Sequence, residues 1–510
     1  MALTGSATAP LGDAVGVSAS LLERLRRILP QPVELRETHA AWVLLSGDVA
    51  LKLRKPVRFA FLDYSTPALR LAAAREEVRV NAALAPGLCR GVRALVEHDG
   101  RIELGPPVET AGAVDYAVEM RRFDERLTMA ARCDAGRLRE RQVDAIARLL
   151  ARFHAGAERC DGGTEAFAAR VRADVGELQQ MTGTRPALAR FAEAALARHA
   201  AELDARAGRG CCRDGHGDLR AEHVVLEQPP LIVDRIEFDA ALRRIDVGSD
   251  LAFLTMDLEL RGCAGAARRL VAAYVRAGGD PGSAGLRTLF AWQRAIVRAK
   301  VALLRDDGEE AERLLALAER LAWRERLAGV TLVSGPPASG KSTLADLLAR
   351  RSGLPVLSSD VVRKELAGAA ATARLDADAY RAEATDAVYR ELGARAARAV
   401  AEQGGAIVDA TGRSQALRRL LLEQLDDRGP VRVLVCEAPA ALRRARADAR
   451  LSDPERVSDA DAAVAERIAA AFEPPLAGEA RIDAVLRVDC RELGDAPLEQ
   501  LAARLDGADA

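Results

Sequence analysis

The feature that most constrains this chain is an eight-residue run at 335–342, which reads Gly-Pro-Pro-Ala-Ser-Gly-Lys-Ser. Its spacing, G-x-x-x-x-G-K-S, places glycines where a backbone turns closely around an anion, and then adds a cation and a hydroxyl. An apolar run at 330–333 precedes it, and a helical pattern at 343–350 follows it. Between a strand and a helix, the N–H groups of such a loop point toward phosphate. The sequence therefore predicts a phosphate-binding loop rather than an ordinary glycine turn.

The loop predicts a binding site for ATP and Mg²⁺. Lys341 is expected to place its charge on the β and γ phosphates and to act in catalysis, and the Ser342 hydroxyl is expected to hold Mg²⁺. The predicted nucleotide-binding residues of this loop are Gly335, Pro336, Pro337, Ala338, Ser339, Gly340, Lys341, Ser342 and Thr343.

Length and net charge limit the classes of protein to which this chain can belong. A chain of 510 residues predicts two or more domains, because single cores rarely grow beyond about 250–300 residues. The net charge is −1 and no basic tract stands out, so neither a nucleic-acid polymer nor a membrane surface is an expected partner. No signal-like start, no apolar run of the roughly 18–20 residues that span a bilayer and no C-x-x-C pair is present, so we expect a cytoplasmic location.

Short apolar runs alternate with helical segments after the loop, which predicts an α/β domain with a mostly parallel sheet. Asp409 ends the third expected strand and is a predicted Mg²⁺ contact. Asp360 follows the second strand, where it is expected to bind the substrate and to accept a proton from an attacking hydroxyl. Arg363, one helical turn later, is a second predicted substrate contact. The alternative for each aspartate is a helix N-cap or turn residue.

Four arginines, at 443, 444, 446 and 450, lie on one expected helix. Arg446 and Arg450 are predicted to bind ATP, and Arg450 is predicted to neutralise the charge of the transferring phosphoryl group. The alternative is a solvated basic face.

These motifs together resemble the small P-loop kinases, which include the gluconate and shikimate kinases, the polynucleotide kinase phosphorylation domain and zeta-toxin-like kinases. The resemblance covers residues 329–505 and rests on the loop, on Ser-Ser-Asp-x-x-Arg at 358–363, on Val-Asp-Ala-Thr at 408–411 and on the arginine helix. It implies that Asp360 contacts or deprotonates the substrate hydroxyl. It also implies that a lid arginine, Arg450 or Arg446, helps to bind ATP.

A second chemical motif, His216-Gly217-Asp218-Leu219, lies in the N-terminal part. Asp218, in a loop that His216 braces, is a candidate base for a substrate hydroxyl. A short strand further on ends in acids, and Asp234, Glu237 and His223 are predicted metal ligands. Two alternatives stay open. His216, His223 and a nearby acid would form a zinc site, or a buried His216 would cap its own loop without any ligand.

Val-Ala-Leu-Lys at 49–52 ends in Lys52, and either Glu76 or Glu77 on the next helix is expected to pair with it. Lys52 and Glu77 are the predicted nucleotide-binding residues here. The order of lysine strand, glutamate helix, His-Gly-Asp loop, acidic strand and Asp-Leu-Ala at 250–252 resembles the aminoglycoside-phosphotransferase-like kinases over residues 32–300. It implies a two-lobed, protein-kinase-like α+β domain. Three departures are a missing G-x-G-x-x-G loop, His223 in place of the usual Asn and Glu237 near the usual metal Asp.

In this order, the two resemblances match fused bacterial proteins that join an aminoglycoside-phosphotransferase-like domain to a P-loop kinase-like ATPase. We expect a flexible N-terminus at 1–20, the first domain at 21–327 and the P-loop domain at 328–510. The expected activity is transfer of the γ-phosphate of ATP to a hydroxyl of a small molecule or nucleotide. Two alternatives are a regulatory ATPase with a degenerate N-terminal kinase domain and a zeta-toxin-like kinase of a nucleotide sugar.

Overall fold

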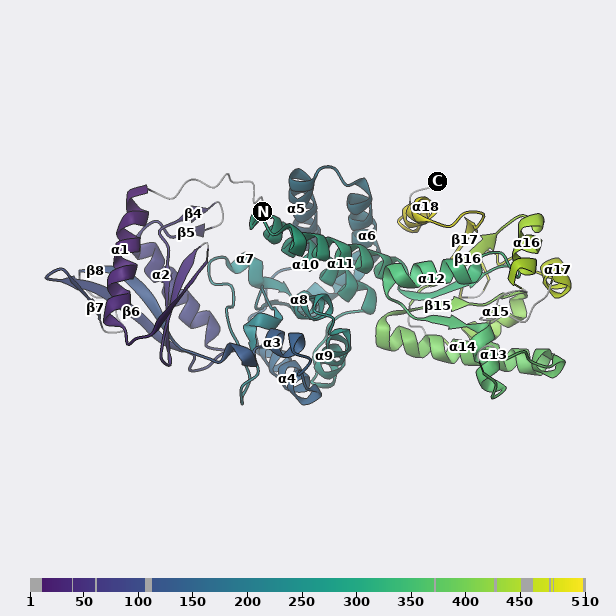
Figure 1. Ribbon diagram of the computed structural model, residues 1–510, viewed down its shortest axis with the longest axis horizontal. Coiled ribbons are helices and arrows are strands. Elements are labelled where there is room, and N and C mark those ends of the chain that lie inside the picture. The colour runs from purple at the N-terminus through teal and green to yellow at the C-terminus, as the bar shows by residue number, and fades with distance from the viewer. Residues whose placement is uncertain are drawn as a thin grey trace. The chain divides into compact units, whose positions relative to one another are not determined.

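The computed structural model describes residues 12–507, except 39, 60–61, 106–111, 371–372, 426–428, 451–461, 477 and 480. The chain divides into two compact units, which are described separately (Figure 1). The first unit consists of Met1–Thr184, His199–Gly282 and Gln293–Ala311, and the second consists of Arg185–Arg198, Ser283–Trp292 and Glu312–Ala510.

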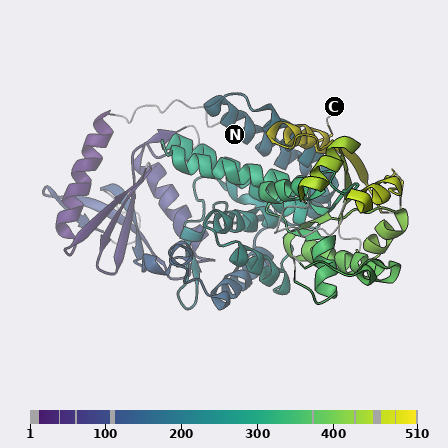
Figure 2. The ribbon, with the colours of Figure 1, turned by 45° about the vertical axis from the view of Figure 1, so that its right-hand side comes forward.

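The first unit begins with a six-stranded antiparallel sheet in the order β1-β2-β3-β8-β6-β7 (Figure 2). Its strands are β1 (Val33–Glu37), β2 (Ala41–Ser46), β3 (Val49–Arg54), β6 (Cys89–His98), β7 (Arg101–Leu104) and β8 (Ala113–Arg121). Alternate residues face opposite sides, so Ala117 packs with leucines of helix α1 (Gly12–Ile28), whereas Tyr116 packs with Leu71 of α2 (Pro67–Asn81). A small hairpin, β4 (Arg58–Phe59) and β5 (Leu62–Asp63), precedes α2.

Helix α1 differs from the flexible segment that the sequence predicted at residues 1–20. The helix begins at Gly12, while residues 1–11 lie outside the described part. Its C-terminal half buries Leu21, Leu22 and Leu25 against the sheet. These leucines have the spacing of an amphipathic helix, and that pattern extends the ordered chain toward the N-terminus.

The connection between β1 and β2 is short. Only residues 38–40 join the two strands, and the segment contains no glycine. Gly47 lies in the turn between β2 and β3, the strand that carries Lys52. The fold therefore has no glycine-rich loop between β1 and β2.

The rest of the first unit is mainly helical and carries the His-Gly-Asp loop. This loop lies between β9 (Cys212–Asp214) and β10 (Val224–Val225), and β10 pairs with β11 (Leu231–Ile232). The other elements are η1 (Glu125–Leu127), α3 (Met129–Asp134), α4 (Glu140–Gly156), α5 (Thr164–Thr182), α6 (Pro186–Gly208), η2 (Ala221–His223), α7 (Ala240–Arg243), β12 (Arg244–Asp246), α8 (Val247–Leu260), α9 (Ala264–Arg276), α10 (Ala284–Leu304) and α11 (Gly308–Arg326). Parts of α6, α10 and α11 belong to the second unit.

The second unit holds a five-stranded, fully parallel sheet in the order β14-β15-β13-β16-β17. The strands are β13 (Gly329–Ser334), β14 (Val356–Ser358), β15 (Gly405–Asp409), β16 (Val431–Glu437) and β17 (Ala484–Asp489). The helices are α12 (Lys341–Ser352), α13 (Ser359–Leu366), η3 (Ala377–Tyr380), α14 (Ala382–Gln403), α15 (Gln415–Leu422), α16 (Ala440–Arg450), α17 (Ala462–Ala470) and α18 (Asp495–Leu505). The predicted parallel α/β architecture is confirmed.

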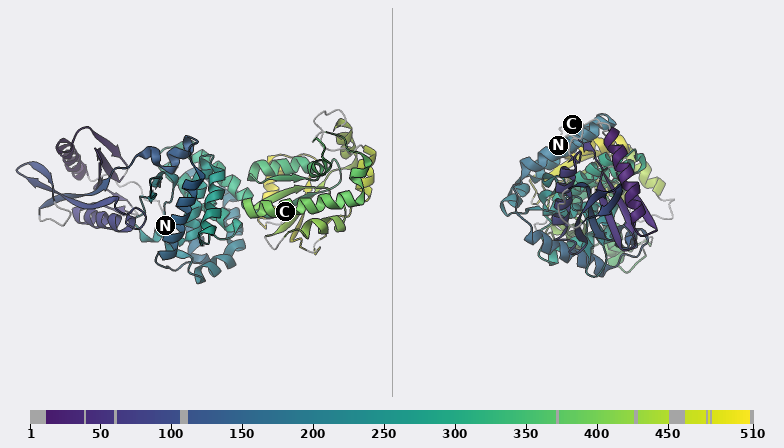
Figure 3. Two further views of the ribbon diagram at one scale, coloured as in Figure 1. Left: turned by 90° about the horizontal axis from the view of Figure 1, so that it is seen from below. Right: turned by 90° about the vertical axis from the view of Figure 1, so that its left-hand side faces the viewer.

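Helices cover both faces of this sheet (Figure 3). On one face, α14 and α15 pack against residues such as Val408, and on the other, α12 and α18 pack against residues such as Ile407. Because successive side chains point to opposite faces, each strand needs apolar residues at nearly every position. This requirement explains the unbroken apolar runs of the sequence.

The second unit also includes chain from before the predicted boundary at 327/328. The rings of Phe191 and Trp292 pack with centroids 5.0 Å apart, and the Arg326 guanidinium lies 4.7 Å from the centroid of Phe191. Arg326 also pairs with Asp506, which follows α18. The compact unit is therefore discontinuous in sequence. Within the described ranges, no helix is long and apolar enough to cross a bilayer.

Candidate active sites

The phosphate-binding loop connects the end of β13 to the start of α12, as the motif predicted. Two of its glycines are required by close packing. Gly335 has a φ of 142°, and a Cβ there would lie 2.7 Å from the carbonyl oxygen of Cys436. Gly340 has a φ of 104°, and a Cβ there would lie 2.9 Å from the Cβ of Cys490. Any side chain at either position would push the loop away from β16 and β17.

Lys341 and Ser342 make the contacts that organise this loop. The Lys341 ammonium donates to the carbonyl oxygen of Pro336 at 3.0 Å, and the Ser342 hydroxyl donates to a carboxylate oxygen of Asp409 at 2.7 Å. Asp409 ends β15 and is in register with Val333 of the neighbouring strand. The structure therefore brings together the three residues that the sequence assigned to ATP and Mg²⁺.

The environment of Asp409 suits a cation. Burial raises the pKa of Asp409, and the charge of Lys341 and the hydrogen bond from Ser342 only partly offset that rise. Hydroxyl and carboxylate oxygens are the ligands that Mg²⁺ prefers, and Mg²⁺ commonly takes its remaining ligands from water and phosphate. Across the described ranges, no three His, Cys, Asp or Glu side chains gather as a separate metal site. The Ser342 and Asp409 oxygens thus fit a nucleotide-bound Mg²⁺.

Asp360 lies in the first turn of α13, directly after β14. The last residue of β14, Ser358, is in register with Asp409, and the charge of Asp360 contributes to the raised pKa of Asp409. The N-cap of α13 is Ser358, so the alternative in which Asp360 caps this helix is wrong. Asp360 is half-buried at the carboxyl edge of the sheet, where ligands of open α/β sheets bind.

Arg363 has protein partners. Its guanidinium donates to the carbonyl oxygen of Ala379 at 2.6 Å and to the Thr385 hydroxyl at 3.3 Å, and it stacks over Tyr380. These contacts tie α13 to η3 and α14. A substrate contact by Arg363, which the sequence predicted, would have to form beside them.

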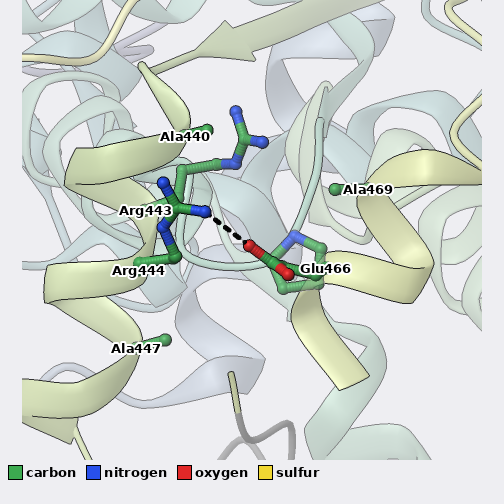
Figure 4. Close-up of a pocket in the computed structure, with 7 residues that line it drawn as sticks. Ala440, Arg443, Arg444, Ala447, Glu466 and Ala469 are labelled. Atoms are coloured by element: carbon green, nitrogen blue, oxygen red, sulfur yellow. Dashed lines mark hydrogen bonds and ion pairs between the residues drawn. The ribbon is translucent and has the colours of Figure 1, made fainter. Parts of the chain in front are cut away.

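The arginines of α16 have different partners. Arg446 donates to the carbonyl oxygens of Cys490 and Arg491 at 2.9 and 3.0 Å, behind Gly340 of the loop. Arg443 and Arg444 line a small pocket with Pro337 of the loop, and Arg444 pairs with Glu466 of α17 at 2.9 Å (Figure 4). The side chain of Arg450 lies outside the described residues.

In the first unit, Lys52 of β3 pairs with Glu77 of α2 at 2.8 Å. Glu77 is buried and also accepts from Arg54 at 2.6 Å. Glu76 instead pairs with Arg79 and Arg243. Of the two glutamates that the sequence left open, Glu77 is therefore the partner of Lys52.

Asp234 lies within reach of Lys52. Its carboxylate is 3.2 Å from the Lys52 ammonium and 3.6 Å from Nε2 of His223. Burial lowers the pKa of Lys52, but Asp234, Glu77 and Glu237 raise it well above its usual value. In turn, the charge of Lys52 holds the pKa of Asp234 below its usual range. Both groups are therefore charged at neutral pH.

Glu237 lies in a different cluster from His223. Its carboxylate accepts from Arg54 at 3.0 Å and from the Tyr64 hydroxyl at 3.2 Å. Of the three predicted metal ligands, the structure places Asp234 beside His223, and it ties Glu237 to Arg54. Sequence reasoning missed Arg54, although the alternation of side chains along β3 places it on the same face as Lys52.

Two buried aspartates accept hydrogen bonds from backbone N–H groups in and next to the His-Gly-Asp loop. Asp250 accepts the N–H groups of His216 and Gly217 at 2.7 and 3.0 Å, and Asp257 accepts the N–H of Ala221 at 2.8 Å. Nε2 of buried His216 donates to the carbonyl oxygen of Val233 at 2.9 Å. His216 thus braces the loop, and its Nδ1 accepts the N–H of Asp218 at 3.3 Å, so both ring nitrogens have protein partners.

Asp218 is already paired with an arginine. Nε of Arg220 donates to both carboxylate oxygens of Asp218 at 3.1 Å, and Nδ1 of His223 donates to the backbone carbonyl of Asp218 at 2.8 Å. Sequence reasoning missed Arg220, although it lies only two residues after the candidate base. Both residues face the same space as Lys52 and Asp234, because His223 contacts both acids.

Comparisons with known proteins give matches to both parts of the chain. A family model described as an AAA domain matches residues 330–475. Solved structures with a similar fold include aminoglycoside 2'-phosphotransferase-IIIa with GDP (15% identity, TM-score 0.40, 61% of this chain and 98% of that chain). A sugar kinase from Janibacter sp. HTCC2649 is similar as well (19% identity, TM-score 0.28, 35% and 95%). The chain thus joins an N-terminal part, with an antiparallel sheet that carries the Lys52–Glu77 pair, to a C-terminal P-loop domain that the AAA family model matches.

Three mycobacterial proteins match both parts together. Rv2004c and MT2060 of Mycobacterium tuberculosis and Mb2027c of Mycobacterium bovis are each 32% identical over 398 residues, 74% of this chain and 77% of each relative. Each of these relatives is named only as an uncharacterized protein. The chain belongs to the family of these mycobacterial proteins.

Proposed function

We propose that this protein is an ATP-dependent phosphotransferase in which both domains bind a nucleotide and transfer its γ-phosphate to a hydroxyl of a small molecule or nucleotide. The observation that supports this best is the hydrogen bond between Ser342 and Asp409, beside the Lys341 loop and close to Asp360. Cation ligands, a phosphate cradle and a candidate base therefore share one edge of the sheet.

In the P-loop domain, the N–H groups of the loop and of α12 bind the phosphates. Lys341 would exchange the Pro336 carbonyl for the β and γ phosphates, and Ser342 and Asp409 would hold Mg²⁺, which would neutralise phosphate charge. Asp360 accepts the proton of the acceptor hydroxyl as the new O–P bond forms. An arginine of α16, Arg446 or Arg450, neutralises the phosphoryl group as ADP leaves.

In the first unit, Lys52 binds nucleotide phosphates while Glu77, which Arg54 fixes in turn, holds the Lys52 side chain in place. Asp234 and His223 lie beside Lys52, where Asp234 would hold Mg²⁺. Asp218 accepts the proton of the acceptor hydroxyl. Most of the rate enhancement in both domains comes from positioning and charge neutralisation, as is usual for phosphoryl transfer.

Incubation with γ-labelled ATP and a metabolite extract tests this proposal. We compare the wild type with Lys341→Ala, Asp218→Ala and the double variant, and use Lys55→Ala as a control, because Lys55 pairs only with Glu37 and Trp42 on the strand edge. Each single variant should lose one set of labelled products, and the double variant should lose both. If the double variant labelled products as strongly as the wild type does, the proposal would be wrong.

A second candidate function, a regulatory ATPase with a degenerate first domain, has one observation in its favour. The three-residue connection between β1 and β2 leaves no glycine-rich loop to cover the phosphates. In this case Asp218→Ala would change no labelled product, while ATP would still raise the melting temperature of the first unit.

A further inference from the structure

The candidate base of the first unit, Asp218, forms an ion pair with the side chain of Arg220. Arg220 contacts both of its carboxylate oxygens at 3.1 Å, and Nη2 of Arg220 lies 3.2 Å from Nε2 of His223. A carboxylate that is bonded through both oxygens is a poor proton acceptor, because the arginine stabilises its charged form. Phosphoryl transfer to an acceptor hydroxyl therefore requires that the ion pair between Arg220 and Asp218 first breaks.

Further positive charge faces the same carboxylate. The charge of Arg298 also acts on Asp218, more weakly than that of Arg220. Arg220 also pairs with Glu222, and Arg298 with Glu310 at 2.5 Å, so each arginine has a second counter-charge or partner acid.

Arg294 is the unusual member of this group. Its side chain is 7% exposed and donates only to the Ser249 hydroxyl, at 3.2 Å, while it stacks over Phe253. Its Nε is buried without a hydrogen-bond partner, and no carboxylate of the described chain lies within ion-pair distance of it. A buried guanidinium without an acid is costly, and the charges of Asp250, Asp174 and Asp218, in falling order, only partly stabilise it.

We propose that the first unit phosphorylates an anionic hydroxyl compound, one that carries a phosphate or carboxylate group close to the reacting hydroxyl. This inference rests on the proposed kinase function. The anion of the acceptor takes Arg220 away from Asp218. Freed Asp218 then accepts the hydroxyl proton, the acceptor oxygen bonds to the γ-phosphorus, and the bond from that phosphorus to the β–γ bridging oxygen breaks, so that ADP leaves with the electron pair.

The same charges disfavour cationic acceptors. An ammonium group near Asp218 would meet Arg220, and like charges brought together cost free energy. A neutral polyol would leave the ion pair between Arg220 and Asp218 in place. The site therefore discriminates between acceptors first by their charge and only then by their shape.

The test uses the full-length Lys341→Ala variant, so that only the first unit can transfer phosphate. A metabolite extract is divided by anion exchange into a retained, anionic fraction and an unretained fraction of neutral and cationic compounds, and each fraction is incubated with γ-labelled ATP. Label should enter the retained fraction alone. Equal or greater labelling of the unretained fraction would overturn the inference and leave the proposed kinase function intact.

Arg220→Gln in the same background should lower kcat/KM for the anionic acceptors by about 10- to 100-fold, as expected for one lost charged hydrogen bond, with the KM for ATP unchanged. The matched control is Arg244→Gln, since Arg244 is exposed in the same unit and its side chain makes no recorded ion pair. A loss of equal size in both variants would contradict a specific role for Arg220.

A second measurement is independent of catalysis. Inorganic phosphate should raise the melting temperature of Lys341→Ala, and this rise should disappear in Lys341→Ala/Arg220→Gln but persist in Lys341→Ala/Arg244→Gln. An unchanged rise in the Arg220 variant would overturn the inference. An Arg220-dependent rise without labelling of any fraction would support the anion site and contradict the proposed transfer by this unit.

Discussion

At the scale of single residues, Glu77 shows how the first site is built. The sequence predicted its pairing with Lys52, but the structure adds Arg54, which binds the other carboxylate oxygen. Glu77 is therefore held even when Lys52 turns toward a ligand. A buried acid with two cations can give up one of them without becoming an isolated charge.

Lys52→Met tests this arrangement. We expect loss of ATP turnover by the first unit of at least about 100-fold, because the phosphates lose their cation. The free energy of unfolding should fall by less than the roughly 3–5 kcal/mol of a broken buried pair, since Arg54 still pairs with Glu77. Labelled-ATP assays in the Lys341→Ala background and urea denaturation measure the two effects. A drop in stability as large as that of Arg54→Met would contradict this division of roles.

Glu479 gives a pH prediction in the second unit. The hydrogen bonds from Arg418 lower the pKa of Glu479, and Arg418 also binds the carbonyl oxygens of Gly412 and Glu473. A carboxylate whose folded pKa is lowered stabilises the protein above the unfolded pKa, about 4.3, and loses this effect as the pH falls through the folded value. Glu479→Gln should therefore cost roughly 1–3 kcal/mol at pH 7 and less below pH 4.

The control for this variant is Glu423→Gln, because Glu423 forms an exposed pair with Arg419 one turn away. Its effect should stay within about 0.5 kcal/mol at every pH. A Glu479→Gln penalty that is the same at pH 3 and pH 7 would mean that the carboxylate charge contributes nothing.

At the scale of elements, Gly393 decides how closely α14 approaches α15. A Cβ on Gly393 would overlap the carbonyl oxygen of Leu421 and lie 2.7 Å from the Cβ of Gln424. Glycine weakens a helix by roughly 0.5–1 kcal/mol relative to alanine, so its presence here reflects packing rather than helix propensity. This contact belongs to the core on one face of the parallel sheet.

Gly393→Ala should therefore destabilise the second unit by roughly 1–3 kcal/mol, as overpacked core substitutions do. Gly176→Ala in α5 is the matched control, because nothing lies within 4 Å of a Cβ there. This second change should stabilise its helix by about 0.5–1 kcal/mol. Denaturant unfolding measures both variants, and equal signs would refute the packing argument.

At the scale of the whole molecule, the second unit extends beyond the boundary that the sequence predicted. Trp323 and Leu327, which precede β13, are buried in the core under α12 and α18. A fragment of residues 328–510 lacks both of them and Arg326, whereas a fragment of residues 312–510 keeps all three.

The P-loop domain should therefore be most stable in the full-length protein, less stable in the fragment of residues 312–510 and least stable in the fragment of residues 328–510. The two fragments should differ by at least about 3 kcal/mol, because loss of a buried tryptophan alone costs about that much. Thermal unfolding with and without ATP measures this order. Equal stability of the two fragments would show that the domain ends at 328.

The sequence predicted where the motif residues lie in the fold, but it did not predict which other side chains contact them. Lys341, Ser342 and Asp409 follow from strand, loop and helix order, because parallel strands bring their carboxyl ends to one edge. The parallel sheet followed from its unbroken apolar runs. Arg220 was missed, since only the folded chain decides which of many arginines turns toward an acid. Arg54 was missed although strand alternation places it beside Lys52; the acids that it contacts depend on the fold. The position of Glu237, away from His223, depends equally on tertiary packing.

The discontinuity of the second unit has a consequence for gene recombination. Residues 185–198 and 283–292, which help to complete that unit, are encoded inside the gene segment for the first. One crossover near codon 328 would thus join a P-loop part to helices shaped for a different partner. Working chimeras between relatives need at least three exchanged segments, and this requirement favours inheritance of the two units as a single gene.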